Sequence, residues 1–225
     1  MVAPSSPETR AARVLDWAFA SYPNEIVLAA SFGGTSGMVL VDMLARSRRN
    51  VPVYYLDTGL LFDQTIALVE RVRERYGIEP IAVRPELDLE AQARLHGDAL
   101  WLRDPDACCA LRKVGPNRAF LAKYKAWITG LRRDQSPTRA GAKFVEWDPD
   151  GRAKISPLVD WTEEEVRAYL REHDVPYNEL LDRGYTSIGC KPCTRYPSEA
   201  DDPRSGRWVN FDKTECGLHV PARSS

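Results

Sequence analysis

The chain has 225 residues, of which 44% are hydrophobic and 28% charged, with a formal net charge of −1. This composition is typical of a globular domain, and the near-neutral charge gives no overall attraction to nucleic acid. No apolar run approaches the roughly 20 residues of a membrane span, and residues 1–10 lack the apolar stretch of a secretory signal. We therefore expect a cytoplasmic enzyme without a membrane or nucleic-acid partner, with a frayed start and an N-terminal segment over residues 1–20.

Strand and helix patterns alternate along most of the chain. Apolar, β-branched runs predict strands over Glu25–Ser31, Val51–Leu56, Ile81–Val83 and Ala126–Thr129. Helical spacing predicts helices over Gly37–Arg48, Phe62–Tyr76 and Thr162–Glu172, the last opened by a capping box of Thr162 and Glu165. This alternation predicts an α/β domain over residues 21–180, an open and mainly parallel sheet with helices on both faces.

Beyond about Tyr177 the pattern weakens into a polar stretch rich in proline and glycine, which contains three of the five cysteines. Such a stretch cannot bury a large apolar core of its own. A metal centre and a bound ligand could order it, because the binding free energy then stabilises the fold. We predict a C-terminal tail over residues 181–225 that binds a metal cluster and takes part in catalysis.

A Gly-rich loop follows the first predicted strand and opens the next helix. It contains Ser31, Phe32, Gly33, Gly34 and Ser36. The glycines let the backbone approach a ligand closely, and the start of the helix offers free N–H groups to an anion. The loop fits neither the GxGxxG nor the Walker A pattern, and a tight turn without a ligand has the same composition.

Two further loops begin where predicted strands end. The second strand ends in Leu56, Asp57 and Thr58. Their carboxylate and hydroxyl could reach a ribose or base, or Asp57 could simply cap the next turn. The fourth strand leads into Gly130, Arg132 and Arg133. Paired arginines offer bidentate donors to phosphate or sulfate, and ligands of open parallel sheets bind at the carboxyl ends of strands.

The five cysteines fall into two close pairs and one remote residue: Cys108 with Cys109, Cys190 with Cys193, and Cys216. An odd number in a chain without an export signal argues against a disulfide framework. The pairs supply four thiolates for a structural zinc site or a [4Fe–4S] cluster, which leaves one thiol free to react. Near that thiol, Lys213 and His219 would favour the thiolate and Glu215 would oppose it.

These motifs, in this order, resemble the adenylyl-sulfate and phosphoadenylyl-sulfate reductase family. The resemblance rests on Ser-Phe-Gly-Gly, Leu-Asp-Thr-Gly, Arg-Arg-Asp-Gln-Ser, Cys-Cys-x-x-Arg-Lys with a later Cys-x-x-Cys, and Lys-Thr-Glu-Cys-Gly-Leu-His. It spans about residues 26–219. The paired cysteines resemble the iron–sulfur branch, which reduces adenylyl sulfate. The resemblance implies the adenine nucleotide alpha-hydrolase-like fold that the ATP pyrophosphatases share.

The resemblance also implies a role for each matching residue. Cys108, Cys109, Cys190 and Cys193 would bind a [4Fe–4S] cluster. Lys113 would lie between cluster and substrate, Arg204 and Arg207 would reach the phosphate and sulfate, and Cys216 with His219 would belong to the catalytic set. Cys216 would take the sulfonate as S-sulfocysteine, and thioredoxin or glutaredoxin would release sulfite in assimilatory sulfate reduction. A homo-oligomer is compatible with all of this.

Three alternatives stay open at this level. The substrate could be phosphoadenylyl sulfate, or both nucleotides. The chain could be a tRNA-thiolating ATP pyrophosphatase, although Phe32 and Thr35 depart from the pyrophosphate loop of that class. It could also be a zinc-stabilised nucleotide-binding module in which Cys216 has no chemical role.

Overall fold

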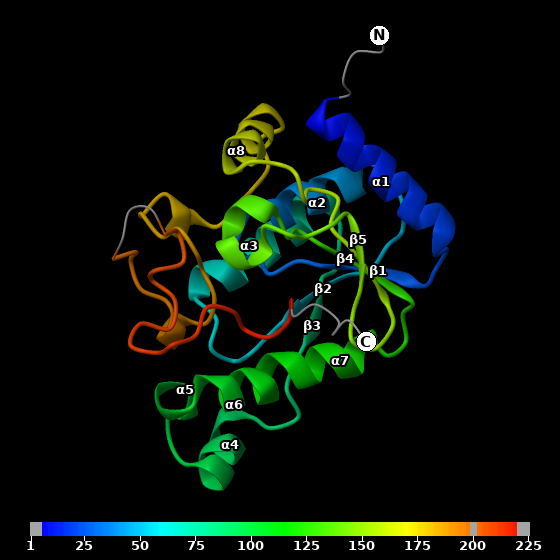
Figure 1. The fold of residues 1–225 in the computed structure, drawn as a ribbon. Coiled ribbons are helices and arrows are strands. Elements are labelled where there is room, and N and C mark those ends of the chain that lie inside the picture. The colour runs from blue at the N-terminus through cyan, green and yellow to red at the C-terminus, as the bar shows by residue number, and fades with distance from the viewer. Residues whose placement is uncertain (1–5, 199–201, 220–225) are drawn as a thin grey trace.

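In the computed structural model, which describes residues 6–198 and 202–219, a six-stranded sheet forms the centre of the molecule (Figure 1). Its strands are β1 (Ile26–Ala29), β2 (Val53–Leu56), β3 (Ile81–Val83), β4 (Ala126–Thr129), β5 (Val145–Trp147) and β6 (Ala153–Ile155). All neighbouring strands run parallel except β5, which is antiparallel to β6. The predicted open and mainly parallel sheet is confirmed, and β5 and β6 extend it beyond the predicted strands.

The strand order β3-β2-β1-β4-β6-β5 reverses direction once. From β1 the chain builds outward through β2 and β3, then returns to place β4 on the other side of β1. The register pairs Ala29 with Thr129, so the loops after β1 and β4 leave the sheet at the same level. Such a reversal opens a crevice at the carboxyl ends of the two strands, where nucleotides bind in open α/β sheets.

Helices cover both faces of the sheet, as predicted (Figure 1). One face carries α1 (Pro7–Ser21), α2 (Thr35–Arg46), α3 (Asp63–Tyr76) and α8 (Glu163–Glu172). The other packs against α7 (Gly115–Leu121), whose Leu121 joins Tyr54 and Trp127 in a second apolar cluster. Successive strand residues such as Val27 and Leu28 enter different clusters, because side chains alternate across a strand.

Helix α1 corrects the expectation of a frayed start for residues 7 onward. Pro7 occupies the first helical turn, where its missing N–H costs nothing, and the hydroxyl of Ser6 accepts from the amide of Thr9. Ala11, Leu15, Ala18 and Phe19 are buried against the core. Arg13 and Asp16 lie between these buried positions, so the apolar face of the helix is hard to recognise in the sequence.

The cysteine pair Cys108–Cys109 lies in a run of helices between β3 and β4 that the sequence did not predict. This run comprises α4 (Leu89–His96), α5 (Leu100–Arg103), α6 (Pro105–Cys109), the π-helical η1 (Ala110–Val114) and α7. A π-helical turn inserts an extra residue per turn and is frequent at functional sites. Here it directly follows the cysteine pair and carries Lys113.

The C-terminal part has little regular structure, as predicted. It contains the short 3₁₀ helices η4 (Glu179–Leu181) and η5 (Lys191–Cys193), and an isolated bridge joins Thr194 to Arg207. Its apolar cluster is small and borrows Phe62 from the loop before α3. Within the described part of the chain, no helix combines the length and apolarity needed to cross a membrane.

Candidate active site

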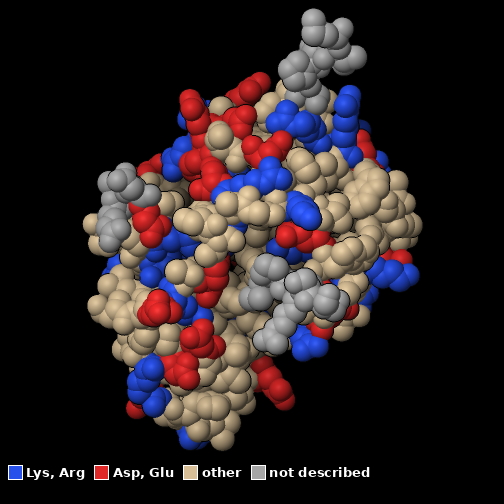
Figure 2. Space-filling model, in the orientation of Figure 1, with Lys and Arg blue, Asp and Glu red and all other residues tan. Residues whose placement is uncertain are grey.

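A pocket opens at the carboxyl ends of β1 and β4, where the strand order reverses (Figure 2). Its walls come from the Gly-rich loop, the loop after β4, helix α7 and the C-terminal tail. The predicted site residues that line it are Ser31, Gly33, Gly34, Ser36, Leu56, Lys113, Gly130, Arg132, Arg204, Arg207, Cys216 and His219. Figure 2 shows Lys and Arg side chains interspersed with Asp and Glu around the centre of the displayed face. The fold therefore gathers residues from distant motifs around one cavity.

The predicted substrate residues that lie outside the pocket lining are Phe32, Asp57, Thr58 and Arg133. Phe32 is fully buried and packs edge-on against Tyr55, with ring centroids 5.5 Å apart. The carboxylate of Asp57 accepts from the amide two residues on, at 3.1 Å, and pairs with Arg84 at 2.9 Å. Asp57 thus caps its turn, which is the alternative that the sequence left open.

Close backbone approach explains two of the glycines in the pocket wall. A Cβ added at Gly130 would lie 2.9 Å from both the amide nitrogen of Gly37 and the Cβ of Ser36. A Cβ added at Gly33 would lie 2.7 Å from the carbonyl oxygen of Ile188. The loop after β4 can approach the start of α2, and the Gly-rich loop can approach the segment around Ile188, only without side chains at these positions.

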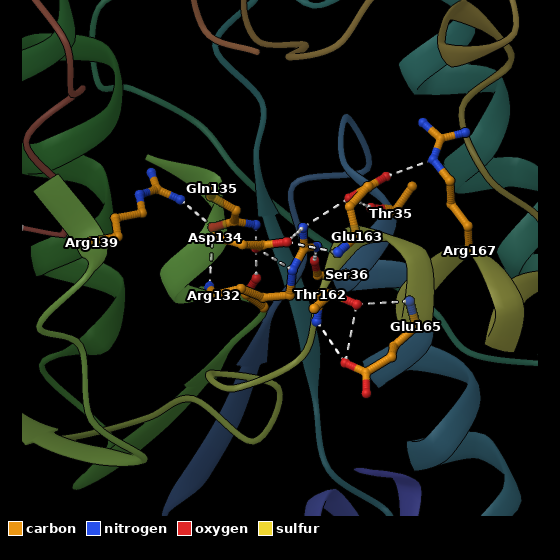
Figure 3. A network of polar contacts seen from close by, with 11 residues as sticks. Thr35, Ser36, Arg132, Asp134, Gln135, Arg139, Thr162, Glu163, Glu165 and Arg167 are labelled. Carbon is orange, nitrogen blue, oxygen red and sulfur yellow. Dashed lines mark hydrogen bonds and ion pairs between the residues drawn. The ribbon is translucent and has the colours of Figure 1, made fainter. Parts of the chain in front are cut away.

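Arg132 is the centre of a polar network behind the pocket (Figure 3). Its side chain is 3% exposed, and its guanidinium donates to both carboxylate oxygens of Asp134, at 2.8 and 3.2 Å, and to Glu163 at 2.8 Å. It also donates to the hydroxyl of Ser36 in the Gly-rich loop. Asp134 in turn accepts from the backbone amide of Glu163 at 2.6 Å, at the first turn of α8.

These contacts use four of the five N–H donors of Arg132 within the protein, which leaves one for its predicted contact with a ligand. The neighbouring Arg133 points away from the pocket, where its Nε donates to the carbonyl of Ala142 at 2.8 Å. The predicted arginine pair therefore divides into a buried residue behind the Gly-rich loop and an exposed one on the outer surface.

The four paired cysteines line a second cavity that adjoins the pocket. Cys108, Cys109 and Cys190 are buried and Cys193 is half-buried. Among the described residues, no three His, Cys, Asp or Glu side chains are arranged to hold one metal ion. Thr58 lies here, with its hydroxyl 3.3 Å from the Sγ of Cys190. The four thiols thus surround a cavity, a donor set that fits an iron–sulfur cluster.

Burial raises the pKa of three of these four thiols. Burial, together with the other three thiolates, raises the pKa of Cys108 to about 12, and burial raises that of Cys109 to about 11. For Cys190, burial acts in the same direction but is outweighed by Lys113, the Thr58 hydroxyl and Arg207, so its pKa is lowered. Four thiolates can coexist here only when positive charge is placed among them.

Lys113 and Arg207 line both cavities and so lie between the cysteines and the pocket. Burial lowers the pKa of Lys113, but Cys190, Cys216 and Cys109 raise it more, so the ammonium stays protonated. The guanidinium of Arg207 stacks on Trp208, 4.4 Å from the ring centroid, and donates to the carbonyl of Cys193 at 3.2 Å. A substrate anion in the pocket would meet both cations.

The tail returns to the pocket through the segment that carries Cys216, which is half-buried. The ring of His219 stacks on Trp127 with a centroid distance of 6.0 Å and an interplanar angle of 12°. Within the described residues its Nδ1 has no hydrogen-bond partner. Burial, then nearby cations, holds the pKa of His219 well below its usual value. Lys213 is engaged by Asp106 rather than by the thiol.

Several pocket residues escaped the sequence-based prediction of the site, namely Tyr54, Asn117, Trp127, Arg139 and Arg167. Tyr54 donates its hydroxyl to Asn117 at 2.7 Å, which links β2 to α7. Arg139 belongs to the predicted arginine loop and could have been included from that motif. Tyr54 and Trp127 look like ordinary strand residues, and only the sheet topology brings them to the pocket.

Fold and site together define a mainly parallel α/β protein whose pocket, at the reversal of strand order, adjoins a cavity lined by four cysteines. A sequence profile of the phosphoadenosine phosphosulfate reductase domain matches residues 25–196. The chain is 50% identical over 208 residues to the adenosine 5'-phosphosulfate reductase of Halalkalibacterium halodurans, covering 92% of this chain and 90% of that protein. It is 46% identical over 215 residues to adenosine 5'-phosphosulfate reductase 1 of Bacillus subtilis, covering 95% and 92%.

Solved structures agree. The phosphoadenylyl-sulfate reductase of Candida auris superposes with a TM-score of 0.72 at 33% identity, covering 87% of this chain and 93% of that one. The FMN adenylyltransferase of Candida glabrata superposes with a TM-score of 0.62 at 18% identity, over 85% of this chain and 65% of that one, and shares the fold alone. The chain belongs to the phosphoadenosine phosphosulfate reductase family, which confirms the resemblance found in the sequence.

Proposed function

We propose that this chain reduces adenylyl sulfate to sulfite and AMP in assimilatory sulfate reduction, with Cys216 as the nucleophile. The observation that carries the proposal is the position of this cysteine. Cys216 lines the same pocket as the Gly-rich loop, Lys113 and Arg207, while the other four cysteines line the adjoining cavity. The names of the bacterial relatives point to the same substrate.

In the first step, the substrate's phosphate lies at the Gly-rich loop, where the N-terminus of α2 offers backbone N–H groups. Lys113 and Arg207 neutralise the sulfate. The thiolate of Cys216 attacks the sulfur, the bond between that sulfur and the phosphate oxygen breaks, and AMP leaves with the bonding electrons. The enzyme then carries S-sulfocysteine at position 216.

In the second step, a thiolate of reduced thioredoxin or glutaredoxin attacks the Sγ of Cys216 and sulfite leaves with the electron pair. The second thiol of the donor resolves the mixed disulfide and restores the Cys216 thiol. The donor is oxidised by two electrons and the sulfur passes from S(VI) to S(IV). We assign this reaction to the cytoplasm, where such dithiols are kept reduced.

We further propose that Cys108, Cys109, Cys190 and Cys193 hold a [4Fe–4S] cluster. When bound, the cluster would supply positive charge that keeps the thiolates ionised and would tie α6 to the C-terminal tail. Lys113, between the two cavities, keeps its proton and faces both the cysteine centre and the substrate. No electron needs to pass through this centre in the scheme above.

The test is Cys216→Ser, with Thr214→Ser as a matched control at an exposed position of the same tail. With adenylyl sulfate and reduced thioredoxin, we expect sulfite release only from the wild type and the control. Without thioredoxin, mass spectrometry should find one sulfonate on the tail peptide of those two proteins. Normal turnover by Cys216→Ser would refute the proposal. A parallel assay with phosphoadenylyl sulfate decides between one substrate and two.

A further inference from the structure

The residue before the proposed nucleophile is held by a two-bond fork. Glu215 accepts from the Nε of Arg139 at 2.7 Å through Oε1, and from its Nη2 at 2.8 Å through Oε2. The Nη2 of Arg204 adds a bond to the backbone carbonyl of Thr214, at 2.7 Å, and a longer one to Glu215, at 3.3 Å. Residues on both sides of the pocket are therefore joined immediately beside Cys216.

The fork is largely withdrawn from water, since the side chains of Arg139 and Glu215 are only 12% and 19% exposed. A bidentate, charge-assisted pair of this kind is stronger and more directional than an exposed ion pair. Arg139 ends η3 (Pro137–Arg139), in the loop that follows β4 and lines the pocket. The fork thus connects the tail to the pocket wall formed by this loop.

The charges around the fork explain how a carboxylate can stand beside a thiol that must react with an anion. Burial would raise the pKa of Glu215, but Arg139 and then Arg204 lower it, so the carboxylate is ionised. Its charge is directed to these two guanidiniums. Lys113 and Arg207, which lie toward the cysteine cavity, remain available to the substrate.

We propose that the Arg139–Glu215 fork is a latch that positions Cys216. The closed latch fixes the tail over the pocket while the thiolate attacks the substrate, and the open latch exposes Cys216 to the donor thiol. Glu215 is a positioning residue, because it acts on the adjacent nucleophile through the backbone. This inference rests on the proposed function, since it describes how the nucleophile of that reaction is held.

The experiment compares Glu215→Gln, Arg139→Gln and the double variant, each with the iron–sulfur cluster loaded. Asp212→Asn is the control, because it removes an exposed carboxylate of the same tail. The rate of Cys216 alkylation by iodoacetamide is followed on the tail peptide. Through charge alone, Glu215→Gln should ease ionisation of the Cys216 thiol and speed its alkylation. Arg139→Gln should hinder ionisation and slow alkylation. The latch predicts faster alkylation in both single variants, by about 10- to 100-fold.

A second readout separates positioning from general damage. Single-turnover formation of S-sulfocysteine should slow by roughly 10-fold or more in each single variant, while thioredoxin-dependent release from preformed S-sulfocysteine should not slow, because the open latch exposes Cys216 to the donor. The double variant should lose no more than either single variant, because the two residues act as one unit. Asp212→Asn should match the wild type in both assays.

Three outcomes would overturn the latch. The alkylation rates of the two single variants could change in opposite directions, both could equal the wild-type rate, or the losses in the double variant could be additive. Alkylation requires no turnover, so it reports the latch separately from the reaction. Activity in Cys216→Ser would instead overturn the proposed function.

Discussion

Replacing Arg132 by Met tests whether this buried arginine braces the Gly-rich loop or binds the substrate. The substitution removes the guanidinium from Asp134, Glu163 and Ser36 and leaves two carboxylates facing each other. Removing one partner of a buried pair costs about 3–5 kcal/mol. The side chains of Asp134 and Glu163 are 31% and 44% exposed, so water can partly replace the lost donor.

We therefore expect the free energy of unfolding of Arg132→Met to fall by about 2–4 kcal/mol, roughly a 30- to 900-fold change in the unfolding equilibrium constant. In urea this corresponds to a midpoint lower by roughly 1 M. Arg133→Met is the matched control, because the adjacent side chain is exposed and makes one bond to Ala142. Its expected loss is below about 1 kcal/mol.

The assay is urea unfolding followed by tryptophan fluorescence, paired with calorimetric titration of AMP. If Arg132 braces the Gly-rich loop, the substitution should lower the urea midpoint. The affinity for AMP should then weaken because Ser36 is displaced. An Arg132→Met protein with a wild-type midpoint but no affinity for AMP would refute this reasoning and restore Arg132 as a direct substrate ligand.

Three further predictions concern the pocket and its tail. Gly130→Ala should lower the free energy of unfolding by about 1–3 kcal/mol in urea, because its Cβ would meet Ser36 at 2.9 Å. Lys113→Met should lower kcat for sulfite formation by about 100-fold or more and also raise KM, because it removes a cation that faces the bound sulfate and the charge that develops in the transition state. Tail docking should weaken as pH falls below about 6.5, because docked His219 has a pKa well below its usual value and only the undocked imidazole takes up a proton. His219→Phe keeps an aromatic ring against Trp127 without a titrating group, so hydrogen exchange in its tail should not depend on pH once intrinsic rates are corrected.

Each of these predictions has an outcome that contradicts it. A wild-type urea midpoint for Gly130→Ala would mean that the loops after β1 and β4 can separate without cost. A kcat within about 3-fold of wild type would remove Lys113 from the charge-stabilising set. Equal pH dependence of tail exchange in the wild type and His219→Phe would show that another group controls docking.

The sequence alone predicted four of the six strands, the Gly-rich loop, the grouping of the cysteines and the family. These features are local: a buried strand has its own apolar pattern, a close backbone approach requires glycine, and paired thiols stand out at short spacing. The capping box of Thr162 and Glu165 is equally local, and both of its hydrogen bonds are present at the start of α8.

Only the tertiary structure decided which polar side chain faces the pocket. Arg132 and Arg133 are adjacent and chemically identical, yet one lies behind the Gly-rich loop and the other on the surface. The carboxylate of Asp57 forms an ion pair with Arg84. Glu215, which the sequence suggested would oppose formation of the Cys216 thiolate, is paired with Arg139. The partners of a charged side chain are set by segments far away in the chain, and these meet only when the strand order brings β4 beside β1 and folds the tail over both.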